Sequence, residues 1–242
     1  MHKKTYSSLL FSFIFLLGYS TFGQSDSSYE KQFDEIVGKE NLGINNGPLY
    51  PKDYPNVVEG KTKYFFNNKF TLGTAVYEGQ SYAEVLLKYD LYDDILIYNP
   101  PNSPASIGVA LISAKVDSFH LHGKKFVNIT KIPAFEKNNN LTGYWQQVEI
   151  SPTLTLYVKH HKKQSKVIED RKVYYSYQTD YTFLVVNGSS HKKVTSKNDL
   201  ISLFEGQASE IDAYYVTHKD MLQNNSPLFY EAILRHLTSQ KN

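Results

Sequence analysis

The chain of 242 residues contains no cysteine. This absence excludes disulfide bonds, thiolate metal ligands, cysteine nucleophiles and the amino-terminal lipid anchor of bacterial lipoproteins. A folded chain of this composition therefore depends on burial of an apolar core, for which it is long enough.

An excess of positive charge is also missing. The whole sequence holds 26 basic and 24 acidic side chains, and two of the basic ones, Lys3 and Lys4, lie in the first 23 residues, where no acid occurs. Residues 24–242 thus have no formal net charge. Binding to nucleic acid draws most of its affinity from a dense positive surface, so we expect no nucleic-acid partner.

Only one long apolar run occurs, from Leu9 to Leu17, and it is too short to span a bilayer as a stable helix. It follows Lys3 and Lys4 and precedes the segment Thr21-Phe22-Gly23, an order typical of a secretory signal peptide. We expect residues 1–23 to be removed, which leaves no transmembrane segment. The sequence thus predicts a protein exported to the periplasm, the outer surface or the medium.

Twenty tyrosines and 14 phenylalanines favour strands, and most apolar residues beyond residue 70 alternate with polar ones. A change to helical spacing begins near residue 195, after a possible capping box at Ser196–Asp199. We expect one α+β domain over residues 24–242. It would contain an antiparallel sheet that is curled, barrel-like or a sandwich, a short helix near 28–38, and helices over about 195–242.

The segment from Phe70 to Leu91 predicts an antiparallel hairpin around a turn at Glu78-Gly79. In its second strand, Val85, Leu87 and Tyr89 are expected to point inward, and Lys88 and Asp90 outward.

Aromatic residues on later strands are the candidate ligand-binding residues. A concavity that stacks a sugar or holds a lipid would be lined by Tyr144, Trp145, Tyr157 and Tyr175. The ordinary alternative is packing between neighbouring strands.

His120 and His122 share one face of a predicted strand, as two zinc ligands would, but no further ligand occurs at an informative spacing. We therefore expect no metal and no cofactor. Asp90, Asp93 and Asp94 lack the turn glycine of a calcium loop and are interpreted as turn residues.

A basic run covers Lys159 to Lys166 without a carboxylate. We interpret it as a solvated connection between two strands. The alternative is a contact with an anionic polysaccharide or a lipid headgroup.

Three segments resemble parts of known proteins. The first runs from Gly73 to Ile97 with the Tyr-Asp pair Tyr89-Asp90 before an acidic turn, and the second is Ser118 to Gly123. With Val194-Thr-Ser-Lys197 they resemble a set of exported proteins of Bacteroidetes-type bacteria that have no assigned activity. The resemblance implies an envelope location and a β-rich fold.

No nucleophile elbow, zinc-binding His-Glu-x-x-His helix, phosphate loop or dinucleotide motif occurs. We therefore expect a non-catalytic envelope or surface protein that binds a partner protein or a surface ligand. Two alternatives stay open: a carrier of an apolar or glycan ligand, and a hydrolase whose site has no recognisable motif. The sequence sets no oligomeric state.

Overall fold

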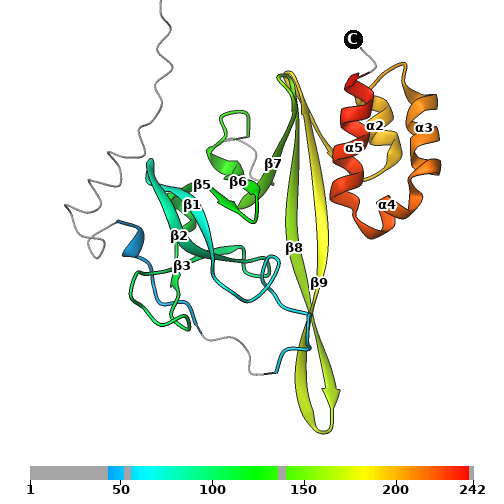
Figure 1. Cartoon of the computed structure of the whole chain (residues 1–242). Coiled ribbons are helices and arrows are strands. Elements are labelled where there is room, and N and C mark those ends of the chain that lie inside the picture. The colour runs from blue at the N-terminus through cyan, green and yellow to red at the C-terminus, as the bar shows by residue number, and fades with distance from the viewer. Residues whose placement is uncertain (1–42, 52–55, 136–139, 240–242) are drawn as a thin grey trace, which may run out of the picture.

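The computed structural model describes residues 43–51, 56–135 and 140–239 (Figure 1). Ten strands come first along the chain: β1 (Thr71–Tyr77), β2 (Gln80–Asp90), β3 (Ile95–Asn99), β4 (Val109–Ala110), β5 (Val116–Leu121), β6 (Lys124–Asn128), β7 (Tyr144–Ser151), β8 (Leu154–Glu169), β9 (Lys172–Asn187) and β10 (Ser190–Val194). Four helices follow: α2 (Lys197–Leu203), α3 (Ala208–Thr217), α4 (Lys219–Asn224) and α5 (Ser226–Ser239). Short 3-10 turns lie at Gly43–Asn45, Ser113–Lys115 and Ile129–Lys131.

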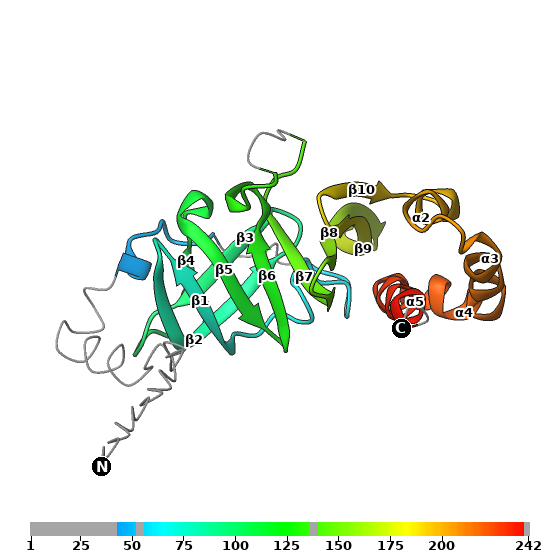
Figure 2. The same ribbon diagram turned by 90° about the horizontal axis from the view of Figure 1, so that it is seen from above.

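The strands form one antiparallel sheet in the order β10-β9-β8-β7-β6-β5-β1-β2-β3-β4. Its two ends are different strands, β10 and β4, so the sheet does not close into a barrel. Strands β1 to β7 lie to one side of the long β8–β9 hairpin, and the helices lie to the other (Figure 2). The predicted α+β class with carboxy-terminal helices is confirmed, whereas the helix predicted near 28–38 lies outside the described residues.

The hairpin β1–β2 has the predicted antiparallel pairing, with Thr71 opposite Leu87. Its turn residues Glu78 and Gly79 both have positive φ, as a tight two-residue hairpin turn requires. Leu87 and Tyr89 are fully buried, and Val85 packs partly against the same core. The predicted inward face of β2 is therefore confirmed.

The outward orientation predicted for Asp90 is wrong, because its side chain is completely buried. The segment around Tyr64 runs antiparallel beside the end of β2: the Phe65 amide donates to the Tyr89 carbonyl, and the Leu91 amide donates to the Lys63 carbonyl. This added segment covers Asp90 and brings Lys63 to it.

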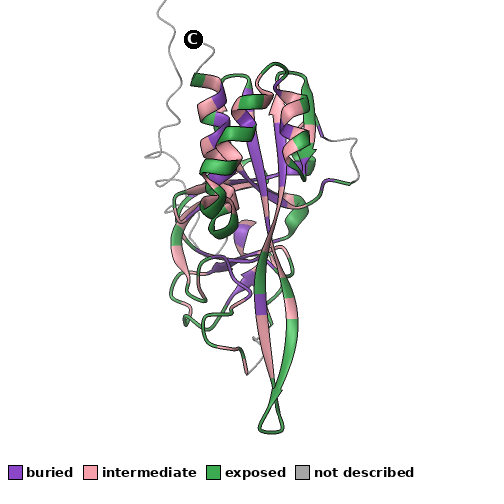
Figure 3. Ribbon diagram, turned by 90° about the vertical axis from the view of Figure 1, so that its right-hand side faces the viewer, coloured by how far each residue is buried: buried purple, intermediate pink, exposed green. Residues whose placement is uncertain are grey.

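The basic run Lys159–Lys166 is not a connection but part of β8, which pairs with β9 residue by residue over 16 positions. The turn lies instead at Asp170 and Arg171, both with positive φ. Because the outer half of this hairpin extends beyond the rest of the sheet, polar side chains on both of its faces reach water. Figure 3 shows this change from a buried inner half to an exposed outer half.

The core lies on both faces of the sheet. Residues paired across neighbouring strands share a face, and Phe126 pairs with Gln146, which in turn pairs with Val158. Phe126 belongs to the aromatic core enclosed by β1 to β7, whereas Val158 belongs to the core under the helices. Both cores therefore lie on one continuous face, and a third cluster around Trp145 and Phe135 covers the opposite face.

The helices bury apolar residues against β8 and β9. The capping box predicted at Ser196 and Asp199 is present and begins α2. On α5, Phe229, Ile233 and Leu237 are fully buried in the core that includes Val158. The start of α5 thereby lies near the middle of β8.

Candidate ligand-binding pocket

A cavity of about 320 Å³ lies on the face of the sheet that carries both large cores. Its position follows from the alternation along β8, in which Val158 contacts the helical core, and His160 and Lys162 come next on the same face. Residues from six segments line it: Phe65, Phe66, Leu91, Lys124, His160, Lys162, Thr179, Tyr181, Asn225 and Pro227. We call it the seam pocket, because it lies between the aromatic core and the helical core.

His160 is the buried polar group of the seam pocket, with 5% of its surface exposed. Its Nε2 lies 2.7 Å from Oε1 of Gln146, to which it donates in the neutral tautomer. The rings of Phe65, Phe126 and Tyr181 surround the imidazole at 5.2 to 5.7 Å between centroids.

The imidazole of His160 is neutral around pH 7. Burial and, secondarily, the positive charges of Lys124 and Lys159 lower the pKa of His160 to about 3. With Nε2 donating to Gln146, Nδ1 keeps its lone pair, and no described residue hydrogen-bonds to it. The lining of the pocket thus includes a hydrogen-bond acceptor to which none of the described residues donates.

Two lysines make the seam pocket positive. Lys162 donates from Nζ to the Thr62 carbonyl at 2.7 Å, and burial and the nearby Lys61 lower the pKa of Lys162. Lys124 is close enough to lower the pKa of His160. Neither lysine forms an ion pair with any described residue, and none of the ten lining residues is acidic. Helix α5 begins next to Asn225, and the positive end of its helix dipole adds to the positive potential of the pocket.

Phe66 forms the rim of the seam pocket. Its side chain is 76% exposed, and its φ of +71° is rare for a residue with a side chain. The ring stacks on His122 with 4.6 Å between centroids and 25° between planes. Residues other than glycine in this left-handed conformation cluster at functional sites, where the surrounding structure holds them in place.

The structure does not bring the four predicted binding residues together. Tyr144 and Trp145 are neighbours on β7 and so point to opposite faces of the sheet. Tyr144 is fully buried in the aromatic core, whereas Trp145 and Tyr157 pack on the other face with Phe135. Tyr175 lies far out on the β8–β9 hairpin, where it pairs with Val57.

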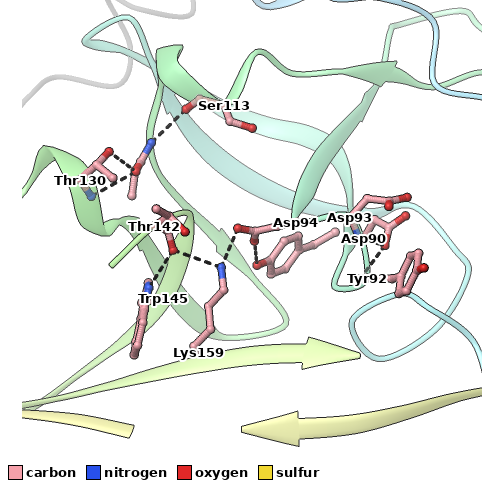
Figure 4. A network of polar contacts seen from close by, with 11 residues as sticks. Asp90, Tyr92, Asp93, Asp94, Ser113, Thr130, Thr142, Trp145 and Lys159 are labelled. Carbon is pink, nitrogen blue, oxygen red and sulfur yellow. Dashed lines mark hydrogen bonds and ion pairs between the residues drawn. The ribbon is translucent and has the colours of Figure 1, made fainter. Parts of the chain in front are cut away.

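The polar atom of Trp145 is already used within the protein. Its Nε1 donates to the Thr142 carbonyl at 3.0 Å, and Lys159 lies beside it, 2.6 Å from the carboxylate of Asp94 (Figure 4). Tyr89 donates to the other oxygen of Asp94 at 2.5 Å. These contacts support the packing alternative for the aromatic residues of β7.

The two histidines of β5 and its turn have separate surroundings. His120 lies 3.2 Å from the Thr74 hydroxyl, and His122 contacts Thr71 and stacks on Phe66. Among the residues that the structure describes, no three His, Asp or Glu side chains are placed to hold a metal ion.

A second cavity, of about 300 Å³, lies beside Tyr50, Tyr64, Phe70 and Lys88. Its lysine is engaged by the protein, because Lys88 Nζ lies 4.1 and 4.7 Å from the ring centroids of Tyr64 and Phe70 and donates to Asn68 at 2.9 Å. The described lining of the seam pocket holds two lysines and a histidine, against one lysine here, so the seam pocket is the better candidate for an external ligand.

Sequence reasoning missed the seam pocket, although His160 and Lys162 lie in the basic run that it noted. Side chains alternate between the two faces along β8, and continuing this alternation beyond Val158 would have placed His160 and Lys162 on its core-facing side. Phe66 carries no signal in the sequence, since it lies in an irregular segment.

No protein-family model, curated protein or solved structure matches the chain. No helix among the described residues has the length and apolar character needed to cross a membrane.

Proposed function

We propose that this protein is exported and acts without catalysis, by binding a small anionic ligand in the seam pocket. The observation that carries the proposal is the pair Lys124 and Lys162, two lysines that line a cavity where none of the described lining residues is acidic. A partly enclosed cation that has no carboxylate partner is stabilised when an anion binds beside it.

The same residues argue against a hydrolase at this site. Its ten described lining residues include no carboxylate and no serine, and the histidine among them, His160, has a pKa of about 3. A general base works best when its pKa is near the operating pH, so this imidazole is a poor proton acceptor. The seam pocket is better suited to holding a ligand than to transforming it.

Chemical-shift titration of the purified protein tests this function. Three anions, benzoate, decanoate and D-glucuronate, would be compared with benzyl alcohol, decanol and D-glucose. We expect at least one anion to shift the amide signals around His160, and the double variant Lys124→Gln/Lys162→Gln to weaken that binding at least 10-fold.

Lys88→Gln is the matched control, because it removes a lysine from the other cavity. It should leave the titration unchanged. The proposal fails if none of the anions binds, or if the double variant binds them as well as the original protein does.

A further inference from the structure

The seam pocket offers more than positive charge, and its neutral polar groups limit which anion fits. Nδ1 of His160 accepts no hydrogen bond from the described residues. A carboxylate alone cannot satisfy it, because an ionised carboxylate only accepts hydrogen bonds. The complementary ligand carries a hydroxyl or N–H group as well as an anionic group.

The mouth of the pocket is also polar. Thr179 and Asn225 are exposed there, and they supply a hydroxyl and an amide that can both donate and accept. A purely apolar tail offers no hydrogen bond to these groups or to Nδ1 of His160. Fatty acids are therefore a poor match.

The ring of Phe66 provides a flat apolar surface at the same mouth. His122 covers one side of the ring, which fixes its orientation, while 76% of the side chain stays exposed. A flat ring held in this way suits the C–H face of a sugar ring, whose hydroxyl groups point outward around its edge.

The volume of about 320 Å³ is near the lower end of the roughly 300–1,000 Å³ that is typical of small-ligand sites. It fits one ring better than a long chain, and the exposed mouth leaves room for a chain to continue into solvent. We infer that the seam pocket binds a carboxylated sugar, a uronic acid, either free or at the end of an acidic glycan. This inference rests on the proposed anion-binding function.

In this arrangement the carboxylate of the sugar lies between Lys124 and Lys162. A ring hydroxyl donates to Nδ1 of His160, and the C–H face rests on Phe66. Lys162 can still form the contact with the carboxylate, because its ammonium has three N–H donors and donates one of them to the Thr62 carbonyl.

Calorimetric titration of the full exported protein tests the inference with defined probes. We expect D-glucuronate or D-galacturonate to bind at least 10-fold more tightly than D-glucose, decanoate and inorganic phosphate, a difference of about 1.4 kcal/mol. Methyl glucuronide and digalacturonate carry a uronic acid joined by a glycosidic bond. If the ligand is the end of a glycan, both should bind at least as well as the free acids. If the ligand is the free sugar, both should bind more weakly.

Two variants test the named contacts. His160→Gln should weaken uronate binding and leave decanoate binding unchanged, because only the sugar donates to Nδ1. If this buried variant folds poorly, Phe66→Ala at the exposed rim gives an independent test and should weaken uronate binding several-fold.

The outcomes separate the inference from the proposed function. If decanoate or phosphate binds as tightly as the uronates and is lost in the Lys124→Gln/Lys162→Gln variant, the sugar inference is wrong and the anion-binding function stands. If no probe binds, or if the lysine variant changes nothing, both fail.

Discussion

The ammonium of Lys63 lies 2.9 Å from the carboxylate of Asp90 in the interior of the protein. Tyr50 completes the cluster by accepting from Lys63 at 2.6 Å and donating to Asp90. Burial alone would lower the pKa of Lys63, but its hydrogen bonds to Tyr50 and Asp90 raise it above its usual value. The cluster ties the irregular segment before β1 to the end of β2.

Asp90→Asn should therefore destabilise the protein strongly. It removes the carboxylate that lies 2.9 Å from the buried ammonium of Lys63, and breaking a buried ion pair typically costs about 3–5 kcal/mol. Asp93→Asn is the matched control, since its carboxylate lies 3.9 Å from Lys63 and is half exposed, and it should cost less than about 1 kcal/mol. Urea unfolding measures both, and equal losses would show that the buried pair has no special role.

Leu87 and Leu86 test the register of β2. Leu87 is fully buried and Leu86 is 37% exposed. Leu87→Ala should lower the free energy of unfolding by about 2–4 kcal/mol, through lost transfer energy and a residual cavity. Leu86→Ala should cost less than about 1 kcal/mol. Denaturant unfolding of the two variants is the measurement, and the reverse order would mean that the strand has its other face inward.

The alternation along β2 was predictable because hydrophobic period and burial coincide at Leu87 and Tyr89. The burial of Asp90 was not predictable, since its partner Lys63 lies in a segment without regular structure. The same period, applied to Tyr144 and Trp145, already places these neighbours on opposite faces and argues against one shared concavity. The alternation beyond Val158 places His160 and Lys162 on the core face, but the pocket itself was not predictable, because only tertiary structure brings Phe66, Lys124 and His160 together.

The leader predicted over residues 1–23 lies outside the described residues and stays a prediction. Intact-mass measurement of the exported protein should show a chain that begins at Gln24. A mature product that retains the apolar run from Leu9 to Leu17 would contradict the assignment.

Gly143 has a φ of +69°, and a Cβ added there would overlap the carboxylate of Asp94. Gly143→Ala should displace Asp94 from Lys159, whose pKa is lowered by burial despite this partner. We expect a loss of about 1–3 kcal/mol beyond that of Gly79→Ala. Gly79 is the matched control because it has a φ of +77° and open space around it. Similar losses in denaturant unfolding would assign the cost to backbone strain alone.

The buried imidazole of His160 should make stability depend on pH. Its pKa falls from an ordinary value of about 6.5 to about 3 on folding, so the unfolded chain takes up the proton first. The stabilisation is complete above about pH 6.5 and is lost progressively toward pH 3, with a slope approaching 1.4 kcal/mol per pH unit.

His160→Gln removes the titrating group and keeps a side chain that can hydrogen-bond to Gln146. The difference in unfolding free energy between the original protein and this variant should therefore change between pH 6.5 and pH 4, in favour of the variant as the pH falls. Urea unfolding at a series of pH values measures this difference, and nitrogen-15 shifts of the imidazole report its charge directly. A constant difference, or an imidazole already protonated at pH 5.5, would show that His160 is not held neutral by burial.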